Sequence, residues 1–451
     1  MNCLRIALYL SLVSCLTGCD LVPQPPNEGD SLDTTLRALL AANQVTPLVK
    51  PDVDAAKVRL GQALFFDKIV SGNRDISCGT CHAPAASTSD GLPLSKGVGG
   101  SGLGPARAAP LDSQGNPIFI PRHSPDVFNR ADFTTLFWDG RVHRDANGDF
   151  STPAHENLLP GLDSALAAQA MFPVTSRAEM RGSAGTNELA DLADDDLPGI
   201  WSGIMDRLQA IPEYSDLFEA AYPGTPQIER TFAHAANAMA AFEIDHWTLI
   251  DSPFDEYLLG DDSTLSDSQK RGAILFFDKA DCGTCHTGPL LTDELFHNRV
   301  IPQLGPGKGH GADGLHDFGR EGVTEDIADR FKFRTPPLRN VTATAPYMHD
   351  GAYVALEDAV RHMLDPRGAA QQYAAAYLAK LPEELQSLYR AEQLSEIIAV
   401  SDPAETKAVA LSDAEFSDLV AFLESLTSPR LGELFVKDIP ESVPSGLSLA
   451  D

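Results

Sequence analysis

The sequence predicts a mainly α-helical protein made of two related domains with long loops. The octapeptide from Gly61 to Lys68 (GQALFFDK) returns almost unchanged from Gly272 to Lys279 (GAILFFDK), and an internal repeat of this kind indicates two copies of one unit. Patterns typical of strands are sparse. Glycine and proline are abundant between the helical stretches, notably in 93–125 and 302–322, which predicts long loops there.

Composition excludes several classes of protein. Of 451 residues, 34 are Lys or Arg and 64 are Asp or Glu, so the formal net charge is −30 and nucleic acid is not expected as a partner. Hydrophobic residues make up 43% and charged residues 22%, which is typical of a globular protein and excludes disorder for most of the chain.

The N-terminus has the pattern of an export signal. The apolar run from Ile6 to Leu16 is too short to cross a bilayer as a mature helix, and it follows Arg5. Its ending, Leu16-Thr17-Gly18-Cys19, resembles a bacterial lipobox, which implies that Cys19 carries the lipid. We therefore expect a signal peptide over 1–18, a lipid-anchored tether over 19–45 and a periplasmic protein that meets the membrane only through this anchor. Plain signal cleavage is the alternative.

Individual helices can be placed from capping and periodicity. Two capping boxes, Ser266 with Gln269 and Ser412 with Glu415, predict where two helices begin. A buried helix ahead of the second repeat is predicted by apolar residues at helical spacing, which are Phe232, Ala236, Met239 and Phe242.

The cysteines point to heme. Cys3 and Cys15 leave with the signal, and the four that follow Cys19 all lie in two C-x-x-C-H motifs, at 78–82 and 282–286. This motif is the pattern for thioether attachment of a c-type heme, because residues i, i+3 and i+4 share one face of a helical turn. A four-thiolate zinc site or a thiol redox pair is the alternative. A histidine directly after each pair favours heme.

These motifs define the expected cofactors and domains. We expect two covalently bound c hemes in two cytochrome c-like domains, 46–250 and 251–430, followed by a C-terminal tail over 431–451. The cofactor-binding residues are Cys78, Cys81, Cys282 and Cys285, and the proximal iron ligands are His82 and His286.

Further motifs resemble the bacterial diheme cytochrome c peroxidase family, which includes the MauG proteins. They are Phe137-Trp-Asp-Gly-Arg141, the segment from Phe331 to Asn340 (FKFRTPPLRN) and the segment from Thr344 to Gly351 (TAPYMHDG). The resemblance spans 53–427. It implies that the N-terminal heme is the peroxide site and that the C-terminal heme stores or relays an electron.

The resemblance also assigns residues to roles. Trp138 matches the tryptophan between the hemes, Glu179 the distal acid/base carboxylate and Gln169 the distal glutamine. A carboxylate is needed because heterolytic cleavage of peroxide moves a proton from the inner to the outer oxygen. Met363 matches the axial methionine of the second heme, where many MauG-type members have tyrosine; its rivals are His362 and Met348.

Two positions depart from the family pattern. Val98 stands where peroxidases that need prior reduction have a histidine ligand, so we expect the peroxide face of the first heme to stay open. His123 replaces an asparagine that contributes to an interheme calcium ion, and histidine is a poor calcium ligand. Calcium there is possible but doubtful, although carbonyls of Thr344 and Pro346 match other ligands of that ion.

A second calcium candidate lies in the loop around Asp145. Asp145, Asn147, Asp149 and Glu156 follow an EF-hand-like spacing, but Phe150 occupies the position that requires glycine. A solvated loop is the simpler interpretation.

The leading hypothesis is a peroxidase that reduces hydrogen peroxide to water with electrons from a small cytochrome or copper protein. The first alternative is a MauG-like enzyme that oxidises residues of a partner protein; Val98 favours it and Met363 counts against it. The second is a nonenzymatic diheme electron carrier, in which Glu179 and Gln169 would have no catalytic role.

Overall fold

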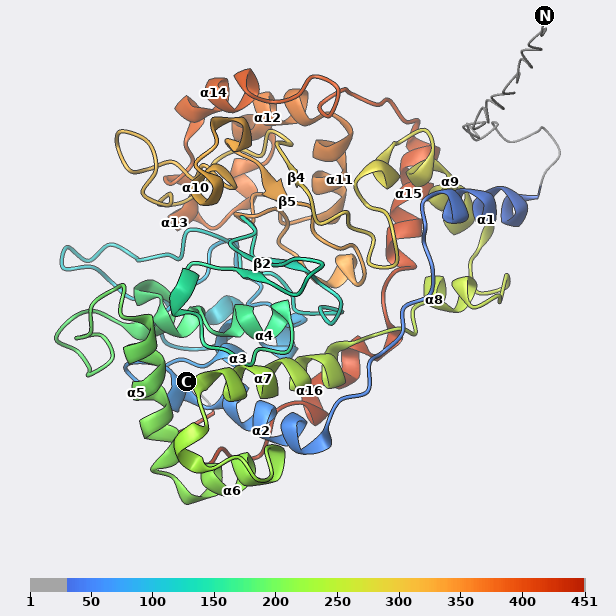
Figure 1. Cartoon of the computed structure of the whole chain (residues 1–451). Coiled ribbons are helices and arrows are strands. Elements are labelled where there is room, and N and C mark those ends of the chain that lie inside the picture. The colour runs from blue at the N-terminus through green and yellow to red at the C-terminus, as the bar shows by residue number, and fades with distance from the viewer. Residues whose placement is uncertain (1–30, 450–451) are drawn as a thin grey trace, which may run out of the picture.

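The computed structural model describes residues 31–449 and confirms a mostly helical protein (Figure 1). The helices are α1 (Leu32–Ala42), α2 (Ala55–Phe66), α3 (Cys78–Cys81), α4 (Ala165–Ala170), α5 (Leu197–Gln209), α6 (Pro212–Ala221), α7 (Phe232–Trp247), α8 (Pro253–Leu258), α9 (Asp267–Phe277), α10 (Glu321–Thr324), α11 (Leu356–Leu364), α12 (Pro366–Ala376), α13 (Glu383–Gln386), α14 (Leu394–Ala399), α15 (Asp413–Glu424) and α16 (Leu434–Lys437). Within these residues no helix is both long enough and apolar enough to span a membrane.

The predicted helix starts are confirmed. Ser266 and Gln269 form a capping box at α9, and Ser412 and Glu415 form one at α15. The helix predicted ahead of the second repeat is α7, which is buried along most of its length because its faces are lined by alanine and other apolar residues.

The sequence repeat folds into the same helix pair twice. In the first half α2 packs against α7, and in the second half α9 packs against α15. Gly61 lies where α2 crosses α7, and a Cβ there would be 1.9 Å from the carbonyl oxygen of Ala238. Gly272 has the same place between α9 and α15, with the carbonyl oxygen of Asp418 1.8 Å away. Glycine is therefore required at both crossings, because any side chain would push the helices apart.

Two small antiparallel sheets lie at the junction of the halves. β1 (Thr135–Leu136), β2 (Val142–Arg144) and β3 (Phe150–Ser151) form one, with Leu136 opposite Val142 and His143 opposite Ser151. β4 (Phe296–His297) and β5 (Phe333–Arg334) form the other. The turn between β1 and β2 holds the Phe137–Arg141 motif. The carbonyl of Trp138 accepts a hydrogen bond from the N–H of Arg334, at 2.8 Å, and so joins the two sheets.

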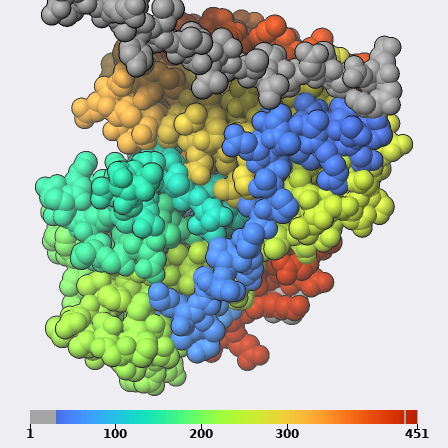
Figure 2. Space-filling model, turned by 45° about the vertical axis from the view of Figure 1, so that its right-hand side comes forward, coloured from blue at the N-terminus to red at the C-terminus, as the bar shows by residue number. Residues whose placement is uncertain are grey.

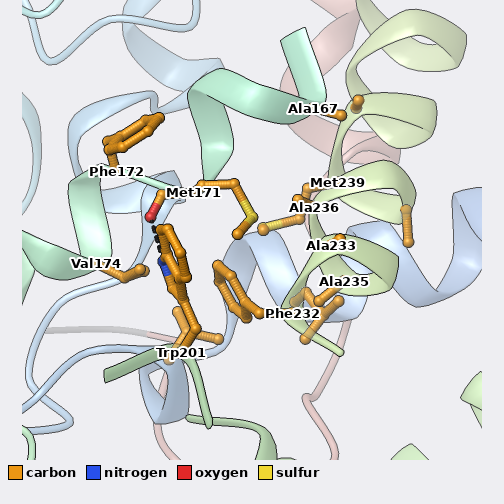
Figure 3. Packing of buried hydrophobic residues seen from close by; sticks show 14 of the residues in the cluster. Ala167, Met171, Phe172, Val174, Trp201, Phe232, Ala233, Ala235, Ala236 and Met239 are labelled. Atoms are coloured by element: carbon orange, nitrogen blue, oxygen red, sulfur yellow. Dashed lines mark hydrogen bonds between the residues drawn. The ribbon is translucent and has the colours of Figure 1, made fainter. Parts of the chain in front are cut away.

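Each half has its own hydrophobic core. In the first half α4, α5 and α7 enclose a cluster that Figure 3 shows from close by, where the indole N–H of Trp201 donates to the carbonyl of Met171 at 2.8 Å. In the second half α1, α9 and α15 contribute apolar residues to a second cluster, together with α8, α11 and the segments between them.

The two ends of the described chain cross over between the halves (Figures 1 and 2). Helix α1 packs on α9 of the second half, and the segment 43–54 then runs along the surface toward α2. The C-terminal segment returns to the first half, where Asp438 accepts hydrogen bonds from the indole of Trp247 and the side chain of His246.

The start of α1 differs from the sequence expectation. Residues 32–42 fall inside the segment assigned to a tether, but they form a helix because the Ser31 side chain caps it and Leu36 and Leu40 are buried. The predicted signal peptide and Cys19 lie outside the described residues.

Candidate heme sites

The first C-x-x-C-H motif folds into a single helical turn, α3. Its start is fixed by a capping box in which the hydroxyls of Ser77 and Thr80 bind each other's backbone N–H groups. The turn places Cys78 and Cys81 on the wall of one cavity, and both thiols are free. This is the geometry that the spacing predicts for thioether attachment.

His82 is oriented as a metal ligand would be. Its Nδ1 donates to the carbonyl of Thr88 at 3.1 Å, which leaves Nε2 unprotonated and available. Burial lowers the pKa of His82, so the ring stays neutral, the form that binds iron. The ring of Phe65, in the repeated octapeptide, lies 6.5 Å from the imidazole.

The same cavity collects the residues predicted for the first heme. Trp138, Gln169 and Glu179 line it together with His82 and the two cysteines, although they are spread over about a hundred positions of the sequence. A neutral imidazole and a carboxylate therefore face one space, an arrangement that would allow acid/base work on a ligand of an iron bound by that imidazole.

Glu179 is held by an unusual backbone. It lies in a π-helical turn over Arg177–Arg181, a feature that is frequent at functional sites. The N–H of Gly72 donates to the carbonyl of Met180, and the N–H of Val98 donates to that of Glu179 at 3.1 Å. Gly97 must be glycine, because a Cβ there would be 1.8 Å from the carbonyl oxygen of Ala178. The loop that carries Val98 is thus fastened directly to the Glu179 turn.

Trp138 is fixed from both halves of the chain. Its indole N–H donates to the carbonyl of His123 at 3.0 Å, while its own carbonyl binds Arg334. His123 in turn donates its backbone N–H to the carbonyl of His349 and its ring Nδ1–H to that of Leu92, both at 2.8 Å. Trp138 therefore lies at the junction of the two halves.

The charges around the cavity fit a c-type heme. Arg130, Lys308 and Arg334 line it, and one guanidinium nitrogen of Arg130 is buried without a partner. Burial and then the charge of Arg130 lower the pKa of Arg334 to about 10, although Asp126, which pairs with Arg130, also lines the cavity. A heme would supply two propionates to such a cluster, and the apolar wall from Phe65, Leu136 and Met239 suits its ring.

The second motif repeats the local geometry of the first. Cys282–Thr284 form a 3₁₀ turn, and Nδ1 of His286 donates to the carbonyl of Leu291 at 2.9 Å, which again leaves Nε2 available. Phe276 takes the place of Phe65, 6.2 Å from the imidazole, and burial lowers the pKa of His286 to about 4.

The hydrogen bonds of His362 exclude it as an iron ligand. Its Nε2 lies 2.9 Å from the carbonyl of Arg299 and must donate to it, so Nδ1 accepts from the hydroxyl of Tyr353 at 2.7 Å. Both ring nitrogens are used. Arg299 also donates to the carbonyl of Met363 at 2.8 Å and so ties α11 to the segment that follows the second motif. Burial lowers the pKa of Arg299, while the nearby Cys285 and Cys282 raise it. Met348 packs in the same apolar cluster as Met363 and remains its rival.

Sequence reasoning missed several residues of these sites. Lys308 and Arg334 belong to the second half, yet they complete the cavity of the first, and no local pattern marks them. His297 lies between Asp293 at 3.1 Å and Glu405 at 3.0 Å, and the bond to Asp293 contributes most to raising its pKa to about 11.

One cluster of ligand-type atoms accompanies the second motif. Cys285, Asp293 and His297 come within 4.8 Å of one another. Because Cys285 belongs to the heme-attachment motif, we assign this cluster to the second heme site and not to a separate ion.

The loop around Asp145 is a tight turn between β2 and β3. The carboxylate of Asp145 accepts from the N–H groups of Asn147 and Asp149, both at 2.9 Å, which is an ordinary turn arrangement and accounts for this residue without an ion.

Comparison with known proteins agrees with this geometry. Residues 55–263 match the family model described as di-haem cytochrome c peroxidase. The chain is 31% identical over 390 residues to the methylamine utilization protein MauG of Methylorubrum extorquens, covering 85% of this chain and 80% of that protein. It is 33% identical over 347 residues to the cytochrome c551 peroxidase of Pseudomonas aeruginosa, covering 75% and 81%.

Solved structures are similar over nearly the whole chain. A MauG-like protein associated with microbial copper homeostasis superposes with a TM-score of 0.58 at 25% identity, covering 88% of this chain and 96% of the other. The diheme peroxidase BthA from Burkholderia thailandensis has the same fold, with a TM-score of 0.56 at 21% identity, covering 89% and 92%. The chain therefore belongs to the di-haem cytochrome c peroxidase family and is an oxidoreductase of that type.

Proposed function

We propose that this protein is a periplasmic diheme peroxidase that reduces hydrogen peroxide to water with electrons from a small redox protein. The observation that carries the proposal is the single cavity in which His82, Cys78 and Cys81 share the walls with Trp138, Gln169 and Glu179. In a nonenzymatic carrier nothing would require a carboxylate and an amide in that space.

The heme bound by Cys78, Cys81 and His82 would supply the iron and the redox chemistry of the peroxide site. The protein's own contribution is proton movement and positioning. Glu179 takes the proton from the inner oxygen of peroxide and returns it to the outer oxygen, which leaves as water. Gln169 can donate a hydrogen bond and orients the peroxide against Glu179. The π-helical turn and its bonds to Gly72 and Val98 keep the carboxylate in place.

The second half would hold the electron-transfer heme, attached at Cys282 and Cys285 and ligated by His286 and Met363. A thioether ligand raises the potential of a heme iron, which suits a site that receives electrons from a donor. Trp138, held from both halves, would lie on the route between the sites, and its bonds to His123 and Arg334 support this role. The net charge of −30 would attract a basic cytochrome or copper protein.

A MauG-like activity on a partner protein is the second candidate, and Val98 favours it. The Val98 side chain packs against the core of the first half and does not line the cavity. Valine cannot ligate iron, so the first site would accept peroxide in the fully ferric protein. The long match to a MauG protein is consistent with this candidate. Met363 counts against it, because it matches the axial methionine of the peroxidases, where many MauG-type members have tyrosine.

One kinetic experiment separates these functions. The ferric holoprotein is mixed with hydrogen peroxide, with and without a reduced cytochrome or copper protein, while heme absorbance and peroxide consumption are followed. Sustained turnover with the donor supports the peroxidase. A heme response without donor-driven turnover supports the protein-modifying enzyme, and no response to peroxide supports the electron carrier.

Export and lipidation belong to the same proposal. If Cys19 is acylated, the mature protein should partition into detergent, and a Cys19→Ser variant should be recovered without the lipid mass. Recovery of unmodified Cys19 protein in the aqueous fraction would refute the anchor.

A further inference from the structure

Tyrosine is concentrated in one corner of the second half. The chain has nine tyrosines, and four of them lie together: Tyr373 on α12, Tyr353 just before α11, Tyr377 just after α12 and Tyr389 after α13. We call these four the tyrosine cluster. All three tryptophans, Trp138, Trp201 and Trp247, belong to the first half. In this corner the phenols are therefore the readily oxidised aromatic side chains.

The rings of the tyrosine cluster form an unbroken series. Centroids are 5.5 Å apart between Tyr353 and Tyr373, 5.1 Å between Tyr353 and Tyr377, and 5.2 Å between Tyr373 and Tyr389. Tyr353 and Tyr373 are buried, whereas Tyr377 and Tyr389 are half-buried and reach the surface. The series therefore leads from the interior to solvent in steps short enough for electron transfer between neighbouring rings.

The inner end of the series meets the second heme site. Tyr353 donates its hydroxyl to His362, which directly precedes Met363, and Tyr353 packs in one apolar cluster with Met363. The tautomer of His362 is fixed by the carbonyl of Arg299, so its Nδ1 is a ready acceptor for the Tyr353 proton. A phenol that loses an electron must also lose its proton, and the acceptor is already hydrogen-bonded.

Packing alone does not account for these hydroxyls. Phenylalanine would fill the same space, whereas each buried hydroxyl needs a partner to offset its desolvation. Tyr373 donates to the carbonyl of Ala352 at 2.8 Å, and Tyr353 donates to His362 at 2.7 Å. Both buried phenols therefore have a bonded acceptor, and for Tyr353 that acceptor is the histidine next to Met363.

We propose that Tyr353, Tyr373, Tyr377 and Tyr389 form a relay that carries electrons from the surface to the second heme site during peroxide reduction when no donor protein is bound. The proposal rests on the proposed function, because hydrogen peroxide is the oxidant. Two phenols each give up one electron and one proton, so one peroxide and two tyrosines yield two waters and two neutral tyrosyl radicals. A small one-electron reductant at the surface, such as a phenol, returns a hydrogen atom to each radical.

The test uses the ferric holoprotein labelled with ring-deuterated tyrosine and mixed with peroxide without donor. Freeze-quench electron paramagnetic resonance is expected to show a tyrosyl radical whose hyperfine splitting changes with the label. Mass spectrometry is expected to find oxidation or dityrosine at Tyr377 and Tyr389. Tyr353→Phe should abolish these marks while the heme absorbance still responds to peroxide. The double variant Tyr377→Phe/Tyr389→Phe, at half-buried positions that tolerate it, should abolish the surface marks.

Tyr222→Phe is the matched control. Tyr222 is also half-buried with a bonded hydroxyl, but it lies in the first half and donates to the carbonyl of His234. Equal oxidation at Tyr222 and Tyr377, or unchanged marks in Tyr353→Phe, would overturn the relay. A normal heme response without any tyrosyl signal would overturn the relay and leave the peroxidase standing. No heme response at all would refute both.

Discussion

Replacing Arg122 by methionine should destabilise the junction between the halves far more than a surface ion pair would. Arg122 is buried, and its guanidinium binds Asp317 through two bonds of 2.6 and 2.8 Å and Asp139 through one of 2.6 Å. Methionine keeps much of the volume but leaves Asp317 buried without its cation. Removing one partner of a buried pair typically costs about 3–5 kcal/mol of unfolding free energy.

The pKa of Asp317 gives a second measure of how much the free energy of unfolding depends on Arg122. Burial is the largest single influence and would raise that pKa, but the charge and hydrogen bonds of Arg122, together with smaller contributions from His349 and the N–H of Gly319, hold it at about 2, below the ordinary 3.8. A difference of this size corresponds to roughly 2 kcal/mol of stability. Because the folded-state pKa is depressed, this stability is present above about pH 4 and is lost as the pH falls toward 2. The difference in the free energy of unfolding between wild type and Arg122→Met should therefore become smaller on acidification.

The assay is urea unfolding of the holoprotein at pH 7 and at about pH 3, inside the range in which this stability is lost, with Arg271→Met as the control. Arg271 also pairs with an aspartate, Asp418 at 2.7 Å, but its side chain is 50% exposed, so its loss should cost less than about 1 kcal/mol. Equal losses in the free energy of unfolding for the two variants would refute this reasoning. A difference between wild type and Arg122→Met that grew on acidification would also refute it.

Four further outcomes are expected. Glu179→Gln should slow the reaction of the ferric protein with peroxide by about 10²–10⁴-fold in stopped flow with heme content unchanged, and a rate within a factor of about three would remove Glu179 from proton transfer. Met363→Leu should lower the potential of the second heme in a redox titration, whereas a shift in Met348→Leu alone would make Met348 the ligand. With Val98 in place, the as-isolated ferric protein should change its Soret band on adding peroxide, and a need for prior reduction would contradict an open first site. Gly272→Ala must separate α9 from α15 and should cost about 1–3 kcal/mol, whereas Gly432→Ala, with open space around it, should be near neutral in the same unfolding assay.

Local pattern was sufficient for much of this protein. The repeat and the two capping boxes depend only on neighbours in sequence, so the helix starts at Ser266 and Ser412 could be predicted. The C-x-x-C-H motifs likewise carry their own geometry, since both histidines use Nδ1 for a carbonyl within the next few residues.

Contributions across the junction could not be predicted in this way. Arg334 reaches the first cavity through β5, which pairs with β4 and binds the carbonyl of Trp138, and Lys308 reaches it from a loop of the second half whose backbone N–H binds the carbonyl of His316. The start of α1 was missed for a related reason. A polar, proline-rich lead-in has the composition of a tether, and only the surface of α9 gives Leu36 and Leu40 somewhere to be buried.

The crossed ends make each half dependent on the far end of the chain. On a growing polypeptide, the Trp247 indole lacks its acceptor until Asp438 has been synthesised, and Asp67, already bonded to Tyr214, gains the Ser445 hydroxyl later still. In the second half the order is reversed, because α1 is synthesised first and cannot pack until α9 has followed. A cut near residue 250 would thus produce two fragments, of which the first lacks the C-terminal segment that covers it and the second lacks α1. Co-expression of the two fragments should restore both of these contacts.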